Sequence, residues 1–244
     1  MNNVFTIVIN LASDTERMQT ISNHLNDLGI EFERLNAVNG RELASDVAGY
    51  SKWRYVLYTA KEKNPGELGC YFSHIEALKR FVESGKDYGL ILEDDVNFPF
   101  EIRELLKAAI DINLKWDILR LSSSKKQFLL GRKRLLGKYD IGYNILPLKN
   151  TAAYLISLNA AKVLIKKLMP MRQPYDVALD QEWRWGLRAA SLSPLPVLLK
   201  DDPGSISKAK RIKIFRYSTF HLYHLTTKVL RMSFRTLFAL FPSR

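Results

Sequence analysis

The chain has 244 residues, 47% of them hydrophobic and 25% charged, which is typical of a globular protein that buries a substantial core. Its single cysteine, Cys70, excludes an intrachain disulfide and fits a reducing compartment. Because no run of about 18 uninterrupted apolar residues occurs, the sequence predicts no membrane-spanning helix, and we recognise no targeting segment at its start.

The formal net charge of +12 is concentrated at the carboxyl end. Residues 208–244 contain nine Lys or Arg residues and no acid, whereas the preceding 207 residues are nearly balanced. We therefore expect one elaborated α/β domain over residues 1–207 and a separate basic tail over residues 208–244.

The first 40 residues predict a parallel βαβ unit. The β-branched and aromatic run at 4–9 predicts a strand, and Ser13-Asp14-Thr15-Glu16 has the pattern of a capping box that starts a helix. Gly29 ends that helix, and a second strand is expected at 30–36. A strand, helix and strand of these lengths favour parallel pairing.

The next segment, 41–64, is rich in aromatic residues but has no clean period, so we interpret it as a lid or an insertion. Pro65-Gly66 is expected to break the chain, and 67–74 to lead into a helix that Gly85 stops. The apolar run at 89–92 then predicts a short strand buried on both faces.

The remaining elements are expected to alternate between helices and strands, with hairpins over the sheet where Lys, Arg and Gly are frequent. We expect helices at 100–114, 158–169 and 183–187, strands at 116–121, 151–157 and 195–199, and hairpins within 122–148.

The predicted strand at 89–92 ends in three consecutive carboxylates, Glu93, Asp94 and Asp95. Adjacent buried acids repel one another, so a positive group is expected beside them. Because side chains alternate along a strand, Glu93 and Asp95 are expected on one side and Asp94 on the other. Mg²⁺ or Mn²⁺ suits these hard oxygen ligands, while a basic side chain or an acidic, solvated loop tip remains an alternative.

A second acidic cluster follows about 85 residues later and comprises Asp176, Asp180 and Glu182. Any of the three is a candidate general base that removes a proton from an attacking hydroxyl. The alternative is a set of solvated acids that pair with Arg184 or Arg188.

Two residues near the start of the helix after Pro65 are candidates for separate roles. His74 is a candidate phosphate contact with help from backbone N–H groups, or a purely structural histidine. Cys70 is expected to be buried packing, because no C-x-x-C or catalytic His/Asn pattern accompanies it.

Five motifs follow one another along the chain: Asn10-Leu11 with Arg17, Asn36-Ala37-Val38-Asn39-Gly40, Gly66-Glu67-Leu68-Gly69-Cys70 with Ser73-His74, Leu90 to Val96, and Ala153-Tyr154-Leu155-Ile156-Ser157 with Ala160-Ala161. As an ordered set they resemble glycosyltransferase family 25, the lipooligosaccharide biosynthesis glycosyltransferases, over roughly residues 3–205. The resemblance implies a GT-A-like fold with a Rossmann-type mixed sheet flanked by helices, a nucleotide-sugar donor that is usually UDP-galactose, Mn²⁺ or Mg²⁺ as cofactor, and inversion at the anomeric carbon.

The resemblance also implies roles for individual residues. Asp95 is expected to contact the metal directly, with Glu93 on the same side, and Asp180, followed by Glu182, is the implied catalytic base. His221 or His224 is a further candidate metal ligand, against simple placement in an amphipathic stretch. The residues implied in donor binding are Asn10, Leu11, Arg17, Ser73, His74, Glu93 and Asp94.

In the basic tail, apolar residues alternate with Lys228, Arg231 and Arg235, as in a helix that lies on a membrane surface. We therefore expect an anionic membrane surface as a partner, alongside the sugar donor and a lipooligosaccharide acceptor, and a cytoplasmic, peripheral location on the inner face of the bacterial inner membrane. The alternative is a C-terminal helix packed on the body.

Two rival functions remain at this stage. One is a Mg²⁺-dependent phosphotransferase or phosphohydrolase, which also uses acids at a strand end, although Asn10-Leu11 offers no early acidic motif. The other is a non-enzymatic basic protein that binds a membrane or a nucleic acid. We expect no nucleic-acid binding, because the charge lies in an apolar, aromatic tail rather than in a nucleic-acid motif.

Overall fold

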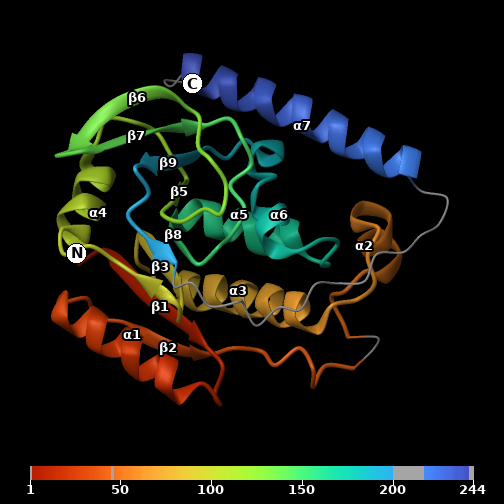
Figure 1. Ribbon diagram of the computed structural model, residues 1–244, viewed down its shortest axis with the longest axis horizontal. Helices are drawn as coiled ribbons and strands as arrows, with labels where there is room; N and C mark the ends of the chain where they lie inside the picture. Colours follow the sequence, from red (N-terminus) through yellow and green to blue (C-terminus); the bar gives the residue numbers. More distant parts are fainter. Residues whose placement is uncertain (1, 45–46, 200–216, 242–244) are drawn as a thin grey trace.

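The computed structural model describes residues 2–44, 47–199 and 217–241, and its centre is a mixed sheet of eight strands in the order β2-β1-β3-β8-β5-β9-β7-β6 (Figure 1). β1 pairs in parallel with β2 and β3, whereas β8 lies antiparallel between β3 and β5. The strands are β1 Val4–Asn10, β2 Glu33–Asn36, β3 Tyr88–Glu93, β5 Ile118–Arg120, β6 Leu129–Leu136, β7 Tyr139–Asn144, β8 Ala153–Ser157 and β9 Ala189–Ser193.

Helices cover both faces of this sheet, and the alternation of buried side chains along the strands explains why. Ile91 belongs to one hydrophobic cluster, and its neighbours Leu90 and Leu92 belong to the other. One cluster includes the buried sides of α1 and α4, and the other those of α3, α5 and α6. The helices are α1 Thr15–Asp27, α2 Lys52–Thr59, α3 Pro65–Glu83, α4 Ile102–Asp111, α5 Leu158–Leu168, α6 Tyr175–Leu179, the 3₁₀ turn η1 Glu182–Trp185 and α7 Tyr217–Leu240.

The α/β architecture expected from the sequence is confirmed: a mixed sheet flanked by helices. The parallel βαβ unit is present as β1, α1 and β2. The hairpin of β6 and β7 does not lie over the sheet as expected, because β7 pairs with β9 and so extends the sheet at its edge.

Three local expectations were wrong. Ser13 does not cap α1, because its hydroxyl bonds to Asp14 and no side-chain cap bond forms. Pro65 does not break the chain but opens α3, since the Asn64 side chain accepts hydrogen bonds from the next two free N–H groups. The strand β9 was missed, and of the expected late strand a two-residue piece, β10 Leu198–Leu199, pairs with β4 Val96–Asn97.

The close contact of two glycines joins α3 to the loop that follows β2. A Cβ atom on Gly40 would lie 1.8 Å from the Pro65 carbonyl oxygen, and one on Gly69 would lie 2.4 Å from the Val38 carbonyl oxygen. The Ser73 hydroxyl, one turn along α3, accepts a hydrogen bond from the Val38 N–H at 2.8 Å. The glycine motifs at 36–40 and 66–70 thus hold α3 against the sheet.

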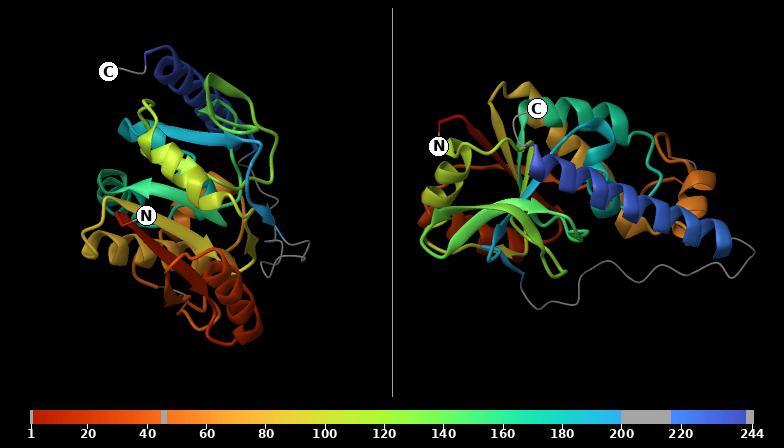
Figure 2. Two further views of the ribbon diagram at one scale, coloured as in Figure 1. Left: turned by 90° about the vertical axis from the view of Figure 1, so that its left-hand side faces the viewer. Right: turned by 90° about the horizontal axis from the view of Figure 1, so that it is seen from above.

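The C-terminal helix α7 lies along the outside of the molecule, beside β6 and β7 and close to α2 (Figures 1 and 2). Tyr223 of α7 stacks on Tyr58 of α2 with a ring separation of 4.7 Å. No helix in the described ranges has the length and apolar character needed to cross a membrane. Residues 208–216 of the predicted tail lie outside the described residues.

Candidate functional site

The three acids Glu93, Asp94 and Asp95 occupy the end of β3 and the turn into β4. β3 is buried on both faces because it lies between β1 and β8 under helices on either side. Ligands commonly bind at such carboxyl ends of strands in open α/β sheets. The three acids have different partners, so each is considered separately.

The side chain of Asp94 is buried and hydrogen-bonded to two residues near the start of the chain. Its two carboxylate oxygens accept hydrogen bonds from Asn10 at 2.7 Å and from Arg17 at 3.1 Å. Burial raises the pKa of Asp94, and the Asn10 and Arg17 contacts oppose that shift. Asp94 thus joins β3 to β1 and α1, and the contacts of Asn10, Arg17 and Asp94 with a nucleotide stay predictions.

Asp95 has a buried carboxylate oxygen, Oδ1, that accepts no hydrogen bond from any described residue. Burial, followed by the negative charge of Glu93, raises the pKa of Asp95 to about 6. A buried anionic oxygen without a donor is costly. A divalent cation would provide the missing positive charge, so Asp95 and the neighbouring Glu93 fit the metal that the family resemblance implies.

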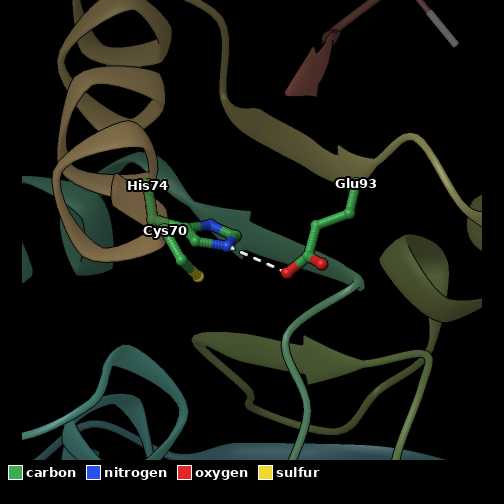
Figure 3. Close-up of side chains that lie close together, drawn as sticks. All are labelled: Cys70, His74 and Glu93. Carbon is green, nitrogen blue, oxygen red and sulfur yellow. Dashed lines mark hydrogen bonds and ion pairs between the residues drawn. The ribbon is translucent and has the colours of Figure 1, made fainter. Parts of the chain in front are cut away.

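Glu93 points toward α3 (Figure 3). Its Oε1 lies 3.3 Å from Nε2 of His74 and 3.4 Å from the Thr151 hydroxyl. The sulfur of Cys70 completes a cluster in which one ligand atom from each of Cys70, His74 and Glu93 lies within 4.8 Å of the others. Cys70 and His74 are one helical turn apart on α3, so both side chains face β3.

The His74 ring is held from its other side by two tyrosines. Nδ1 lies 3.2 Å from the Tyr154 hydroxyl, and the ring stacks on Tyr175 with centroids 4.2 Å apart. The Tyr154 and Tyr175 hydroxyls are 3.0 Å apart. Metal-binding histidines usually use one ring nitrogen for the metal and the other for such a partner. The cluster of Cys70, His74 and Glu93 can therefore hold a metal that accepts sulfur, nitrogen and oxygen ligands, of which Zn²⁺ is the commonest.

The sequence predicted Cys70 as buried packing and did not identify it as a candidate metal ligand. Burial raises the pKa of the Cys70 thiol well above its ordinary value, and the Glu93 charge adds to the shift. The signal that could have found it was the Cys-x-x-x-His spacing on a helix, which places both side chains on one face.

Asp180 and Glu182, the implied catalytic bases, are buried against α7 rather than open to an acceptor. Arg235 of α7 donates hydrogen bonds to Glu182 at 2.7 and 2.8 Å and to Asp180 at 3.2 Å. The Leu148 N–H also donates to Asp180 at 3.3 Å, and Arg120 lies 3.7 Å away. A catalytic role for either acid stays a prediction, and the observed contacts are structural.

Asp176, the third acid of that cluster, differs because it is partly exposed and no basic side chain contacts it at salt-bridge distance among the described residues. It accepts a hydrogen bond from the N–H of Val177 at 2.8 Å. Burial raises the pKa of Asp176, and the negative charge of Asp176 contributes to the raised pKa of Cys70. A raised pKa suits a general base.

Three other predicted residues have local roles in the structure. Ser73 is buried, and its hydroxyl donates to the Gly69 carbonyl at 2.7 Å. The Leu11 carbonyl accepts the Asp14 N–H at 2.9 Å, in the turn before α1. His224 lies 3.2 Å from the Tyr58 carbonyl at the contact of α7 with α2, outside the Cys70 cluster, and the side chain of His221 is outside the described residues.

A cavity of about 680 Å³ lies elsewhere, at the amino ends of β1 and β2. Phe5, Phe32 and Arg103 are among its lining residues. None of the predicted site residues lines this cavity, so we place the candidate site at the opposite, carboxyl ends of the strands.

The family model described as "Glycosyltransferase family 25 (LPS biosynthesis protein)" matches residues 3–179, which include α3, β3 and the cluster of Cys70, His74 and Glu93. The chain belongs to glycosyltransferase family 25. The match ends before Asp180, Glu182 and α7, so the contact of Arg235 with the second acidic cluster lies outside the part of the family that the match covers.

Curated relatives of the family 25 chain include a "Glycosyltransferase 25 family member" of Aedes aegypti, 29% identical over 67% of this chain and 29% of the relative. "Procollagen galactosyltransferase 1" of Danio rerio is 25% identical over 85% of this chain and 39% of the relative. A rat protein, "Probable inactive glycosyltransferase 25 family member 3", is 26% identical over 77% of this chain and 36% of its own length. The chain thus spans between 29% and 39% of the length of these relatives.

Among solved structures, A197 from STIV aligns with the family 25 chain at a TM-score of 0.45 and 13% identity, over 86% of this chain and 98% of that one. A glycosyltransferase involved in the glycosylation of the major capsid of PBCV-1 aligns at a TM-score of 0.36 and 10% identity, over 68% of this chain and 66% of that one.

Proposed function

We propose that this family 25 protein transfers galactose from UDP-galactose to a sugar hydroxyl of lipooligosaccharide, with a divalent metal and inversion at the anomeric carbon. The family description names LPS biosynthesis, which supports the acceptor class, and three relatives are named procollagen galactosyltransferases, which supports the sugar. The observation that carries the proposal is the unpartnered buried oxygen of Asp95 beside Glu93 at the end of β3.

Asp95 and Glu93 are the residues that would hold Mn²⁺ or Mg²⁺ in this proposal. The bound ion would neutralise charge on the diphosphate of the departing UDP. Asp94, fixed by Asn10 and Arg17, holds the turn in which Asp95 lies and so sets the position of the Asp95 carboxylate. Preorganised charge of this kind is usually a large contribution to catalysis.

Asp176 is the base in this proposal, in preference to Asp180 and Glu182. It is partly exposed and has a raised pKa, whereas the other two are committed to Arg235. In a single displacement, the acceptor oxygen forms the bond to the anomeric carbon as the bond to the UDP oxygen breaks. The proton of the acceptor hydroxyl passes to the Asp176 carboxylate.

The proposed place of action is the cytoplasmic face of the bacterial inner membrane, where a lipid-linked acceptor and a soluble nucleotide sugar meet. The peripheral location rests on the outward face of α7, for which the argument is given below.

The test is UDP release by the full chain with a panel of UDP-sugars, with and without Mn²⁺, using truncated lipooligosaccharide as acceptor. We expect release with UDP-galactose that a chelator abolishes and Mn²⁺ restores. Procollagen serves as a second acceptor, since relatives carry that name. Release of inorganic phosphate instead of UDP would favour the phosphohydrolase alternative. If folded protein released no UDP with any pair of donor and acceptor, that result would contradict transfer by this chain.

Asp95→Asn is the variant that tests the metal assignment. It keeps the size of the side chain but removes the charge, so we expect metal-dependent release to fall on the order of a hundredfold or more. Asp111→Asn, an exposed acid on α4, is the matched control and is expected to retain full release.

A further inference from the structure

The C-terminal helix α7 buries two polar side chains against the body and exposes a row of large apolar side chains to solvent, unlike an ordinary surface helix. Thr227 and Arg235 are its buried residues among those described. Arg184 donates to the Thr227 hydroxyl at 3.3 Å, and Arg235 binds Glu182 and the Asn144 carbonyl. The stacking of Tyr223 on Tyr58 and of Phe234 on Trp183 adds to these hydrogen bonds and ion pairs in holding α7 in place.

The opposite face of α7 is apolar and exposed. Leu225 is 60% exposed, Val229 55% and Leu240 65%. Spacings of four and eleven residues place these three side chains on one side of the helix. The exposed large apolar residues at the carboxyl end of the described chain are Leu225, Val229, Leu230, Phe234, Leu237, Leu240 and Phe241, and we call them the outward face of α7.

No acid interrupts this face, since 217–240 contains neither Asp nor Glu. A solvated helix normally carries charges where this one carries Leu, Val and Phe. Contiguous exposed apolar patches of this kind mark interaction sites, because leaving them in water is unfavourable.

The charges around the outward face are positive. Lys228 is exposed on α7 itself, and Arg132 and Lys133 are exposed on the neighbouring strand β6. The nine residues before α7, 208–216, contain five Lys or Arg residues and no acid in the sequence. A partner surface should therefore be apolar and negatively charged.

We propose that the outward face of α7 docks on an anionic lipid surface, with the helix lying in the plane of the membrane. A second copy of the chain fits less well, because two such faces would bring like charges together. A spanning arrangement does not fit, since α7 lacks the apolar character for it. An amphipathic helix with a basic flank is the usual form of a peripheral anchor.

Two contributions would act together at this surface. Apolar side chains enter the boundary between headgroups and acyl chains, and Lys and Arg residues are attracted to anionic headgroups. Neither contribution alone gives stable anchoring, so binding should require both the apolar face and an anionic lipid.

This inference does not rest on the proposed function, because it uses no residue of the candidate site as a membrane contact. The two are connected through Arg235, which fixes α7 to the acidic cluster at 180–182. Docking would thereby orient the body of the protein relative to the lipid surface.

The experiment is flotation of the full chain with vesicles of phosphatidylcholine alone or with added phosphatidylglycerol. Truncation of α7 is unsuitable, since it would leave Glu182 without Arg235. The variant is instead Leu225→Gln with Val229→Gln and Leu240→Gln, three exposed positions where folding should not be affected. We expect anionic vesicles to bind the full chain, and the triple variant to bind on the order of a hundredfold more weakly.

Phe100→Gln is the matched control, because Phe100 is 84% exposed but lies just before α4 and is not part of α7. It should float like the unaltered chain. High salt should weaken the binding of the unaltered chain and of Phe100→Gln to anionic vesicles, since surface charges are then screened.

Three results would overturn the proposal: no flotation of the full chain on anionic vesicles, equal flotation of the triple variant, or equal flotation on phosphatidylcholine alone. Sedimentation velocity tests whether a second copy of the chain, rather than a membrane, covers the outward face. A dimer that the triple variant abolishes would make the outward face an interface between copies. UDP release measured on a soluble acceptor is independent of each of these results, so failure of the docking proposal and failure of the proposed function are distinguishable.

Discussion

Arg235 of the C-terminal helix and Glu182 of the η1 turn form a buried ion pair in which two guanidinium nitrogens donate to the two carboxylate oxygens at 2.7 and 2.8 Å. Both side chains are at most 1% exposed. Burial raises the pKa of Glu182 and Arg235 opposes that shift, so the carboxylate depends on its partner. In this structure the pair therefore fixes α7 to the body, as in the packed C-terminal helix that was the alternative to a membrane-binding tail.

Arg235→Met should destabilise the protein by about 3–5 kcal/mol, because it leaves the Glu182 charge buried and unpaired. Chemical denaturation measures the free energy of unfolding. Lys228→Met, an exposed position on the same helix, is the control and should change it by less than about 0.5 kcal/mol.

Adding Glu182→Met to Arg235→Met should restore part of the loss, since the unpaired charge is then removed. A single Arg235→Met variant as stable as the unaltered chain would show that α7 does not depend on this pair.

Asp176→Asn should lower the rate of transfer by about 10²–10⁴ if Asp176 is the general base, with little change in stability. The comparison is Asp180→Asn, whose side chain contacts Arg235 and the Leu148 N–H, so stability should fall there first. The transfer rates and melting temperatures of the two variants show which of the two acids is the general base. If Asp180→Asn lost the rate while remaining as stable as the unaltered chain, the base would be Asp180.

The cluster of Cys70, His74 and Glu93 should bind Co²⁺ with the intense near-ultraviolet absorption of a sulfur-to-cobalt charge transfer. Cys70→Ser should abolish that absorption, because serine supplies no thiolate. Asp95→Asn keeps all three ligands and is the matched control. A titration of the full chain with no such absorption would mean that sulfur is not a metal ligand, and that the metal lies with the oxygen ligands of Glu93 and Asp95.

Asp117 should make stability depend on pH. Burial raises its pKa, while the Arg188 N–H, which donates to its carboxylate at 2.9 Å, opposes the shift. Because the folded pKa lies above the unfolded one, the proton binds the folded state more tightly, and the carboxyl destabilises the fold above its folded pKa. That penalty disappears as the pH falls below the unfolded pKa.

Asp117→Asn keeps an oxygen acceptor for Arg188 and removes the charge. The variant should therefore be more stable than the unaltered chain at pH 7, and the difference should shrink as the pH is lowered toward about 4. Urea denaturation at several pH values measures this difference. A constant difference across that range would contradict the assignment.

The sequence predicted the βαβ start, the buried strand before the three acids, and the helices α4 and α5, because periodicity and turn residues are local signals. It missed β9, a five-residue strand with two alanines and two serines that has little intrinsic strand signal and forms because β5 and β7 pair with it. The start of α3 was misjudged, since the capping role of Asn64 was not recognised.

For the candidate site, the sequence identified the acids at 93–95 but not their different partners. The contacts of Asp94 with Asn10, and of Glu93 with His74, join segments 84 and 19 residues apart, and only the fold determines such pairs. The partner of Glu182 was equally unpredictable. Arg184 and Arg188 were expected because they are near in sequence, whereas Arg235 is 53 residues away.

The position of β8 has a consequence for how the chain folds. The strands β2, β1 and β3 on one side, and β5, β9, β7 and β6 on the other, are joined in the sheet only through β8, among the described residues. β3 ends at Glu93, whereas β8, the strand that pairs with its second edge, begins at Ala153. That edge of β3 therefore stays unpaired until about 60 further residues have been added to the chain. Sheet closure is a late, non-local step, and a nascent chain that stops before Ala153 would present an unpaired, apolar strand edge prone to aggregation.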